Sequence, residues 1–132
     1  MFSLATGAAI GVLIDPFKVS ELELARRLYA SIEPGDVALA DRAYGTYVDL
    51  ACVIAQGADA VFRCHQGRLS DFRRGKRLGK DDHLVTWNKP PKPPKHMNAQ
   101  AFAQLPEFIT VRQIRFQVVQ PGYRTKTIIV VR

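Results

Sequence analysis

This sequence of 132 residues contains few cysteines and no long apolar run. Cys52 and Cys64 are its two cysteines, too few for a disulfide framework, which fits a reducing compartment such as the cytoplasm. No apolar stretch approaches the ~18 residues that a membrane-spanning helix needs. The N-terminus also lacks a basic segment ahead of an apolar one, so we expect no secretory signal. These absences predict a cytoplasmic protein with no membrane partner.

Several motifs with defined chemistry are missing as well. There is no Cys-x-x-Cys pair, so the two cysteines and the three histidines give little support to a zinc site, and Cys52 is expected in the core. Neither a Gly-x-Gly-x-x-Gly motif nor a P-loop is present, which removes the usual signals of nucleotide binding. The sequence also offers no convincing Ser, His and Asp combination for nucleophilic catalysis.

What the chain does contain is a globular composition with a localised positive charge. Hydrophobic residues make up 47% and charged residues 23%, which suits one ordinary folded domain. Residues 63–96 hold ten Lys or Arg against three Asp, while the remaining nine of each sign cancel. A cluster of this kind predicts a polyanionic partner such as DNA, because Lys and Arg neutralise phosphates. A solvated basic loop is the alternative.

The basic cluster also alternates with apolar residues, namely Phe62, Leu69 and Phe72. This spacing favours an ordered basic surface over a flexible tail. The candidate DNA-binding residues of the cluster are Arg68, Arg73, Arg74, Lys76, Arg77 and Lys80. Arg42, which lies outside it beside Asp41, is a further candidate for contacting a DNA phosphate, with a structural salt bridge as the equal alternative.

Residues 1–63 show the alternation of strands and helices that is typical of an α/β half-domain. Ser20 with Glu23, and Thr46 with Asp49, have the spacing of helix N-terminal caps. The expected elements are a hairpin of Phe2–Leu4 and Ala9–Ile14 about Thr6-Gly7, a helix from Ser20 to about Ile32, a strand at Val37–Ala40, a helix at Tyr47–Gln56 ended by Gly57, and a strand at Ala58–Arg63.

Residues 64–132 differ in composition from residues 1–63 and predict a basic, β-rich module. The expected elements are a strand at His83–Trp87, an extended proline-rich connector at Lys89–Lys95, a short helix at Asn98–Leu105, and long strands at Phe108–Val119 and Arg124–Val131 joined by a hairpin turn at Gln120–Tyr123. The apolar alternation changes phase near Arg112-Gln113, which predicts a bulge or bend. Trp87 is expected to pack in the core more readily than to stack on a base.

The most informative segment is Val37–Ala40 with the carboxylate that follows it. Four consecutive apolar residues predict a central strand, buried on both faces of a parallel or mixed sheet. Asp41 would then lie at the carboxyl edge of that strand, where open α/β sheets place their chemistry. The alternative is that Asp41 only caps the next turn.

The segment GDVALADRAYGTY, with SELELARRLYASIEP before it and GADAVFRCHQGR after it, resembles the second-aspartate region of bacterial insertion-sequence transposases. These are DDE-type enzymes with a ribonuclease-H-like core, and the similarity is to the insertion-sequence-4 type. DFRRGKRLGKDDHLVTWNKP and LPEFITVRQIRF also resemble the insertion that some members carry. The resemblance implies a partial ribonuclease-H-like mixed sheet over residues 1–63 and a β-rich insertion over residues 64–132.

The resemblance also implies a chemistry, namely phosphodiester cleavage followed by strand transfer at two Mg²⁺ ions about 4 Å apart. Asp41 matches the second of three metal carboxylates. The first Asp and the final Glu would fall outside these 132 residues. Asp15, Asp36 and Asp49 are better explained as turn or cap residues, and Asp81-Asp82 belongs to the basic module. We therefore expect the chain alone to be catalytically inactive.

Three functional hypotheses follow. The first is a transposase fragment that binds DNA at transposon ends and meets full-length transposase in a synaptic dimer. The second is a non-enzymatic nucleic-acid-binding or regulatory protein derived from a transposase. The third is an unrelated small α/β enzyme in which Asp41 works with other acids.

Overall fold

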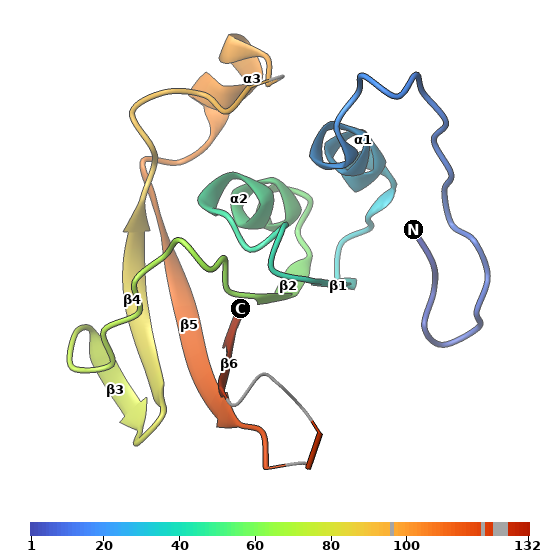
Figure 1. The fold of residues 1–132 in the computed structure, drawn as a ribbon. Helices are drawn as coiled ribbons and strands as arrows, with labels where there is room; N and C mark the ends of the chain where they lie inside the picture. Colours follow the sequence, from blue (N-terminus) through green and yellow to red (C-terminus); the bar gives the residue numbers. More distant parts are fainter. Residues whose placement is uncertain (96, 120, 123–126) are drawn as a thin grey trace.

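A single six-stranded mixed sheet runs through the chain, with the strand order β1-β2-β6-β5-β4-β3 (Figure 1). The computed structural model describes residues 1–95, 97–119, 121–122 and 127–132. The strands are β1 (Val37–Ala40), β2 (Asp59–Arg63), β3 (Lys76–Gly79), β4 (Asp82–Asn88), β5 (Phe108–Gln117) and β6 (Thr127–Val131). β1 and β2 are parallel and the other neighbouring pairs are antiparallel. The prediction of a mixed α/β fold is confirmed.

Three α-helices accompany the sheet in the described residues: α1 (Glu21–Leu28), α2 (Tyr47–Ala55) and α3 (Ala99–Gln104). The caps of α1 and α2 are the residues that the sequence identified. Ser20 accepts a hydrogen bond from the Glu23 amide, and Thr46 accepts one from the Asp49 amide. A short 3₁₀ turn, Tyr29–Ser31, extends α1. None of the described helices has the length and hydropathy that crossing a bilayer would require.

The core joins residues from both halves of the sequence. Leu50 and Val53 of α2 are fully buried with Phe62 of β2, Val111 of β5 and Val131 of β6. β6 pairs with β2 on one side and with β5 on the other, so the sheet continues across residue 63. The expected division between residues 1–63 and residues 64–132 therefore falls inside one continuous sheet.

The prediction that Val37–Ala40 is a central strand buried on both faces is wrong. β1 lies at the end of the sheet order, and Val37 and Leu39 are each 56% exposed. Only Ala38 and Ala40 pack against the core. The apolar run is uninterrupted because the exposed positions also carry apolar residues, Val37 and Leu39, and not because both faces are covered.

Of the bulge or bend predicted near Arg112-Gln113, the bulge is wrong. β5 pairs with β4 and with β6 without a register shift through these residues. Gln113 continues the inward-facing positions of Ile109 and Val111 and is itself buried. The phase change in the sequence arises because a polar residue occupies a core-facing position.

The two predicted hairpins differ in outcome. At the N-terminus the turn forms, with Gly7 at a φ of 70°, but its arms make only an isolated bridge between Phe2 and Ala9 and no strands. At the other end β5 and β6 pair as predicted. Gln120 and residues 123–126 of that turn lie outside the described residues.

Candidate functional site

Asp41 follows β1 directly, as predicted, but its hydrogen bonds stabilise the turn that it begins. Its Oδ1 atom accepts a hydrogen bond from the Ala43 amide at 2.8 Å, and its carbonyl oxygen accepts one from Tyr44. The side chain is exposed. The Tyr44 hydroxyl donates to Glu21 at 2.8 Å, which attaches the turn to the start of α1. This geometry matches the alternative in which Asp41 caps a turn.

Asp41 belongs to no described group of metal-ligating side chains. Across the described residues there is no group of three or more His, Cys, Asp or Glu that could hold a metal ion. Most of the other candidate acids are committed elsewhere. Asp15 pairs with Arg27, Asp36 accepts a hydrogen bond from the Glu33 amide, Asp81 pairs with Arg115, and Asp82 pairs with Arg112.

Neither cysteine belongs to a group of possible metal ligands in the described part of the chain. Burial and the charge of Asp49 raise the pKa of the Cys52 thiol to about 11. Burial likewise raises the pKa of Cys64. Both thiols are therefore protonated at neutral pH and are not in the reactive thiolate form. His96, the third histidine, lies outside the described residues.

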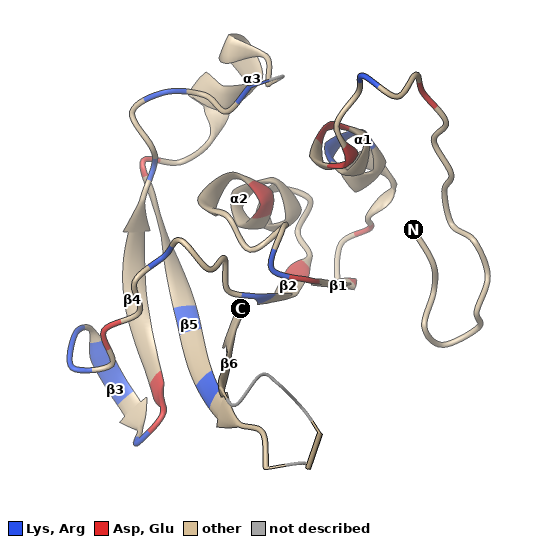
Figure 2. Cartoon of the chain, viewed as in Figure 1, with Lys and Arg blue, Asp and Glu red and all other residues tan. Residues whose placement is uncertain are grey.

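Five of the predicted DNA-binding residues lie together on residues 71–80, which we call the basic hairpin (Figure 2). They are Arg73, Arg74, Lys76, Arg77 and Lys80, and all are exposed. The hairpin comprises a loop, strand β3 at the edge of the sheet and the turn toward β4.

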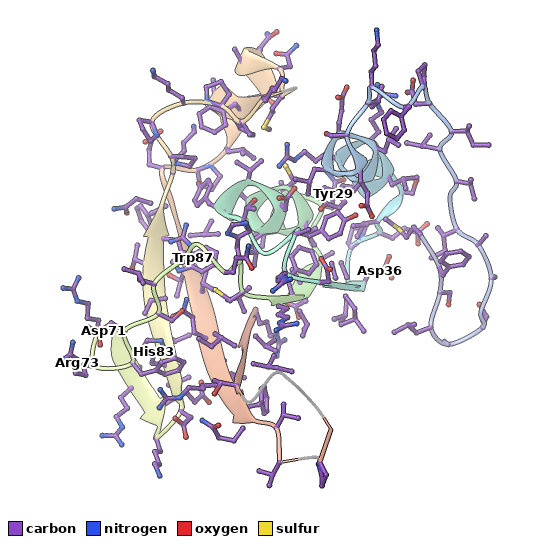
Figure 3. The ribbon with its side chains drawn as sticks, in the orientation of Figure 1. Tyr29, Asp36, Asp71, Arg73, His83 and Trp87 are labelled. Carbon is purple, nitrogen blue, oxygen red and sulfur yellow. The ribbon has the colours of Figure 1, made fainter. Side chains whose placement is uncertain are left out.

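Asp71 partly neutralises the loop end of the basic hairpin. It hydrogen-bonds Arg73 through both carboxylate oxygens, at 2.9 and 3.1 Å, and lies 3.5 Å from Arg74 (Figure 3). The hydrogen bonds from Arg73 lower the pKa of Asp71 to about 2. Lys76 and Lys80 make no ion pair with any described residue, so their charges are the least neutralised of the hairpin.

Buried contacts fix the basic hairpin to the sheet. His83 of β4 is 1% exposed, and its Nδ1 atom donates to the Arg74 carbonyl at 2.7 Å. Its Nε2 atom pairs with the Gln113 side chain at 2.9 Å. The His83 ring stacks on Phe72 with 4.3 Å between centroids. The hairpin is thus an ordered surface, as the sequence predicted.

The two remaining candidates lie elsewhere. Arg42 follows Asp41, is exposed, and its side chain makes no hydrogen bond or ion pair within the described residues. Arg68 lies in the segment after β2, with its guanidinium carbon 3.7 Å from the centroid of the Trp87 ring. Trp87 is 3% exposed, so its predicted place in the core is confirmed. Leu69, expected to alternate inward, is 97% exposed because this segment is a loop and not a strand.

The sequence missed a buried ion pair beneath the Asp41 turn. Asp49 of α2 is fully buried and accepts hydrogen bonds from Arg26 of α1 at 2.8 and 3.2 Å. Burial alone would lower the pKa of Arg26, but the hydrogen bond and charge of Asp49 outweigh it and raise that pKa. The Thr46 spacing identified Asp49 only as a cap residue, since a partner on a separate helix leaves no local signal.

The described residues therefore offer basic surfaces and no cluster of side chains that could hold a metal ion. Comparisons with known protein families, with curated proteins and with solved structures found no match to this chain.

Proposed function

We propose that this chain is a fragment of a DDE-type, insertion-sequence-4-like transposase that binds DNA and does not carry out strand transfer alone. The observation that carries the proposal is the basic hairpin, where five exposed cations sit on one ordered edge of the sheet. Ordered cations on one surface suit phosphate contacts. The transposase ancestry rests on the sequence resemblance around Asp41.

Two features of the fold support this ancestry. β1 and β2 are parallel neighbours, and Asp41 follows the carboxyl end of β1, an arrangement compatible with part of a ribonuclease-H-like sheet. The same features limit the chemistry. A two-metal site needs several carboxylates, whereas Asp41 is a single carboxylate that already accepts a backbone hydrogen bond. The residues present do not fit a pair of Mg²⁺ ions, which belong to the intact enzyme.

DNA binding is tested by fluorescence anisotropy with duplex DNA over a range of salt concentrations. We expect Lys76→Gln/Lys80→Gln to weaken binding and to reduce the salt slope by about 2, since each lysine that neutralises a phosphate contributes close to one. Lys18→Gln/Lys95→Gln is the matched control, since it removes the same charge from exposed positions outside the hairpin. Equal effects of the two variants would contradict a specific role of the hairpin.

Catalysis is tested by nicking of supercoiled plasmid in Mg²⁺ or Mn²⁺. We expect no cleavage by the wild-type chain, because Asp41 lacks the other carboxylates of a two-metal site. Cleavage that disappears in Asp41→Asn would show that the chain is active and would overturn the second half of the proposal.

A further inference from the structure

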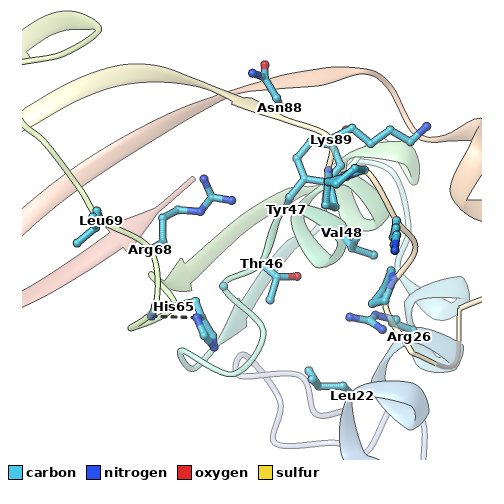
Figure 4. A pocket seen from close by; sticks show the side chains of 16 residues that line it. Leu22, Arg26, Thr46, Tyr47, Val48, His65, Arg68, Leu69, Asn88 and Lys89 are labelled. Carbon is cyan, nitrogen blue, oxygen red and sulfur yellow. Dashed lines mark hydrogen bonds between the residues drawn. The ribbon is translucent and has the colours of Figure 1, made fainter.

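A cleft of about 970 Å³ includes Gly45, the residue after Tyr44 of the Asp41 turn, and none of the five cations of the basic hairpin in its lining (Figure 4). Four segments form its walls: α1 on one side, the start of α2, the loop after β2, and the proline-rich segment after β4. Gly45 lets two of these walls meet, because a side chain there would lie 2.1 Å from the Arg63 carbonyl oxygen.

The cleft carries positive charge without a described carboxylate in its lining. Its four cations are Arg26, Arg68, Lys89 and Lys92. Two of them are already committed. Arg26 binds Asp49, and the Lys89 ammonium donates to the carbonyls of Ala103 and Leu105 at the end of α3.

Arg68 and Lys92 are the uncommitted cations of the cleft. Neither side chain makes a hydrogen bond or an ion pair with any other residue in the described part of the chain. Arg68 is also half-buried, and burial lowers the pKa of its guanidinium, so an anion beside it would relieve the cost of desolvation. The guanidinium carbon lies 3.7 Å from the centroid of the Trp87 ring, so the indole contacts the cation without neutralising its charge.

We infer that this cleft binds a short single-stranded segment of DNA, with Arg68 and Lys92 contacting its phosphates. Its volume matches the upper end of small-molecule pockets, ~1,000 Å³, which admits a few flexible nucleotides and not a duplex. Proteins that bind single strands combine a basic groove along the phosphates with planar side chains, aromatic or guanidinium, on which bases stack. Apolar wall residues, among them Leu22, Leu69 and Pro91, suit sugars and bases.

The inference rests on the proposed function for the identity of the polyanion, but its test is separate. Trp87 is the only tryptophan, so its emission reports on Arg68 directly. The probes are an oligothymidylate of about ten nucleotides, within the usual site size for single strands, and a duplex of the same length. We expect the single strand to change Trp87 emission saturably and the duplex to leave it unchanged.

Substitutions then separate the two surfaces. Arg68→Met keeps an aliphatic stem over Trp87 and removes the charge, and we expect it to weaken single-strand binding about tenfold without affecting duplex binding. Lys92→Gln should act in the same direction and, being exposed, should leave folding intact. Lys76→Gln/Lys80→Gln should weaken duplex binding and leave single-strand binding unchanged. Thermal unfolding of each variant checks the fold. If Arg68→Met is misfolded, the effect of Lys92→Gln on single-strand binding tests the inference in its place.

The failures are distinguishable. If duplex binds through the basic hairpin but the oligothymidylate neither changes Trp87 emission nor responds to Arg68→Met and Lys92→Gln, the cleft inference is wrong and the proposed function stands. If neither probe binds at low salt, both are wrong.

Discussion

At the residue scale, the buried carboxylate of Asp49 has more structural consequence than the exposed one of Asp41. Asp49 connects α1 to α2 through Arg26 and is capped by Thr46, all beneath the turn that carries Asp41. Exposed ion pairs contribute little to stability, but a buried carboxylate left without its partner is costly.

We predict that Arg26→Met lowers the free energy of unfolding by about 3–5 kcal/mol, since Asp49 would remain buried without its counter-charge and with only the hydroxyls of Thr46 and Tyr29 donating to it. The matched control is Arg27→Met on the same helix, where the side chain is 49% exposed, and its effect should be below about 1 kcal/mol. Urea unfolding followed by circular dichroism measures both. The double variant Arg26→Met/Asp49→Asn should recover part of the loss, and the absence of any recovery would argue against the charge as the cause.

At the element scale, the position of the short strand β3 depends on a close approach between the backbones of Gly75 and β4. This residue has a φ of 80°, and a Cβ atom there would lie 2.1 Å from the Leu84 carbonyl oxygen of β4. The basic hairpin keeps its position on the sheet through this close approach and through the His83 hydrogen bond to Arg74.

Gly75→Ala is therefore expected to displace the basic hairpin as well as to strain its backbone. Gly35→Ala is the matched control, because Gly35 has a φ of 90° with open space around it. The control should cost about 1–2 kcal/mol from the left-handed backbone alone, and Gly75→Ala should cost clearly more. Only Gly75→Ala should also weaken duplex binding in the anisotropy assay. Similar losses of stability and of duplex binding in both variants would mean that the close approach at Gly75 does not position the hairpin.

The elements that the sequence predicted well are those with local signals. Ser20 and Thr46 identified the starts of α1 and α2, and the apolar pattern located β2 and β4. What failed depended on distant residues. The exposure of β1 depends on which strands lie beside it, and the burial of Gln113 depends on His83, a partner thirty positions away.

The candidate site followed the same rule. The five cations of the basic hairpin are close in sequence, so composition alone identified them. Arg68 was named from the same cluster, but its position over Trp87 and its share in a separate cleft come from contacts between the loop after β2 and β4. No pattern of spacing contains that information.

At the scale of the whole molecule, β6 holds the two halves of the sequence together. It pairs with β2 and β5, and Val131 is fully buried against Phe62 and its neighbours. A sheet and a core that cross residue 63 predict that the two segments unfold as one unit.

We expect Val131→Asp to abolish folding of both segments, because it places a charge in the shared core. Val119→Asp is the control, since Val119 is 93% exposed, and its effect should stay within about 0.5 kcal/mol. In the wild-type chain, Trp87 fluorescence and helical circular dichroism should report one coincident transition in urea. Two separated transitions would indicate that residues 1–63 and 64–132 form independent domains.

The place of β6 also bears on how the protein is made. β2 and β5 are both synthesised before the strand that separates them in the sheet. Val131 leaves the ribosome roughly 3–14 s after its partner Phe62, at ordinary rates of translation. During that interval β2 presents an unpaired edge to the crowded cell, and β5, which is synthesised later, does so for a shorter time. Aggregation of this chain should thus depend on translation speed and chaperones more than on the stability of the finished fold.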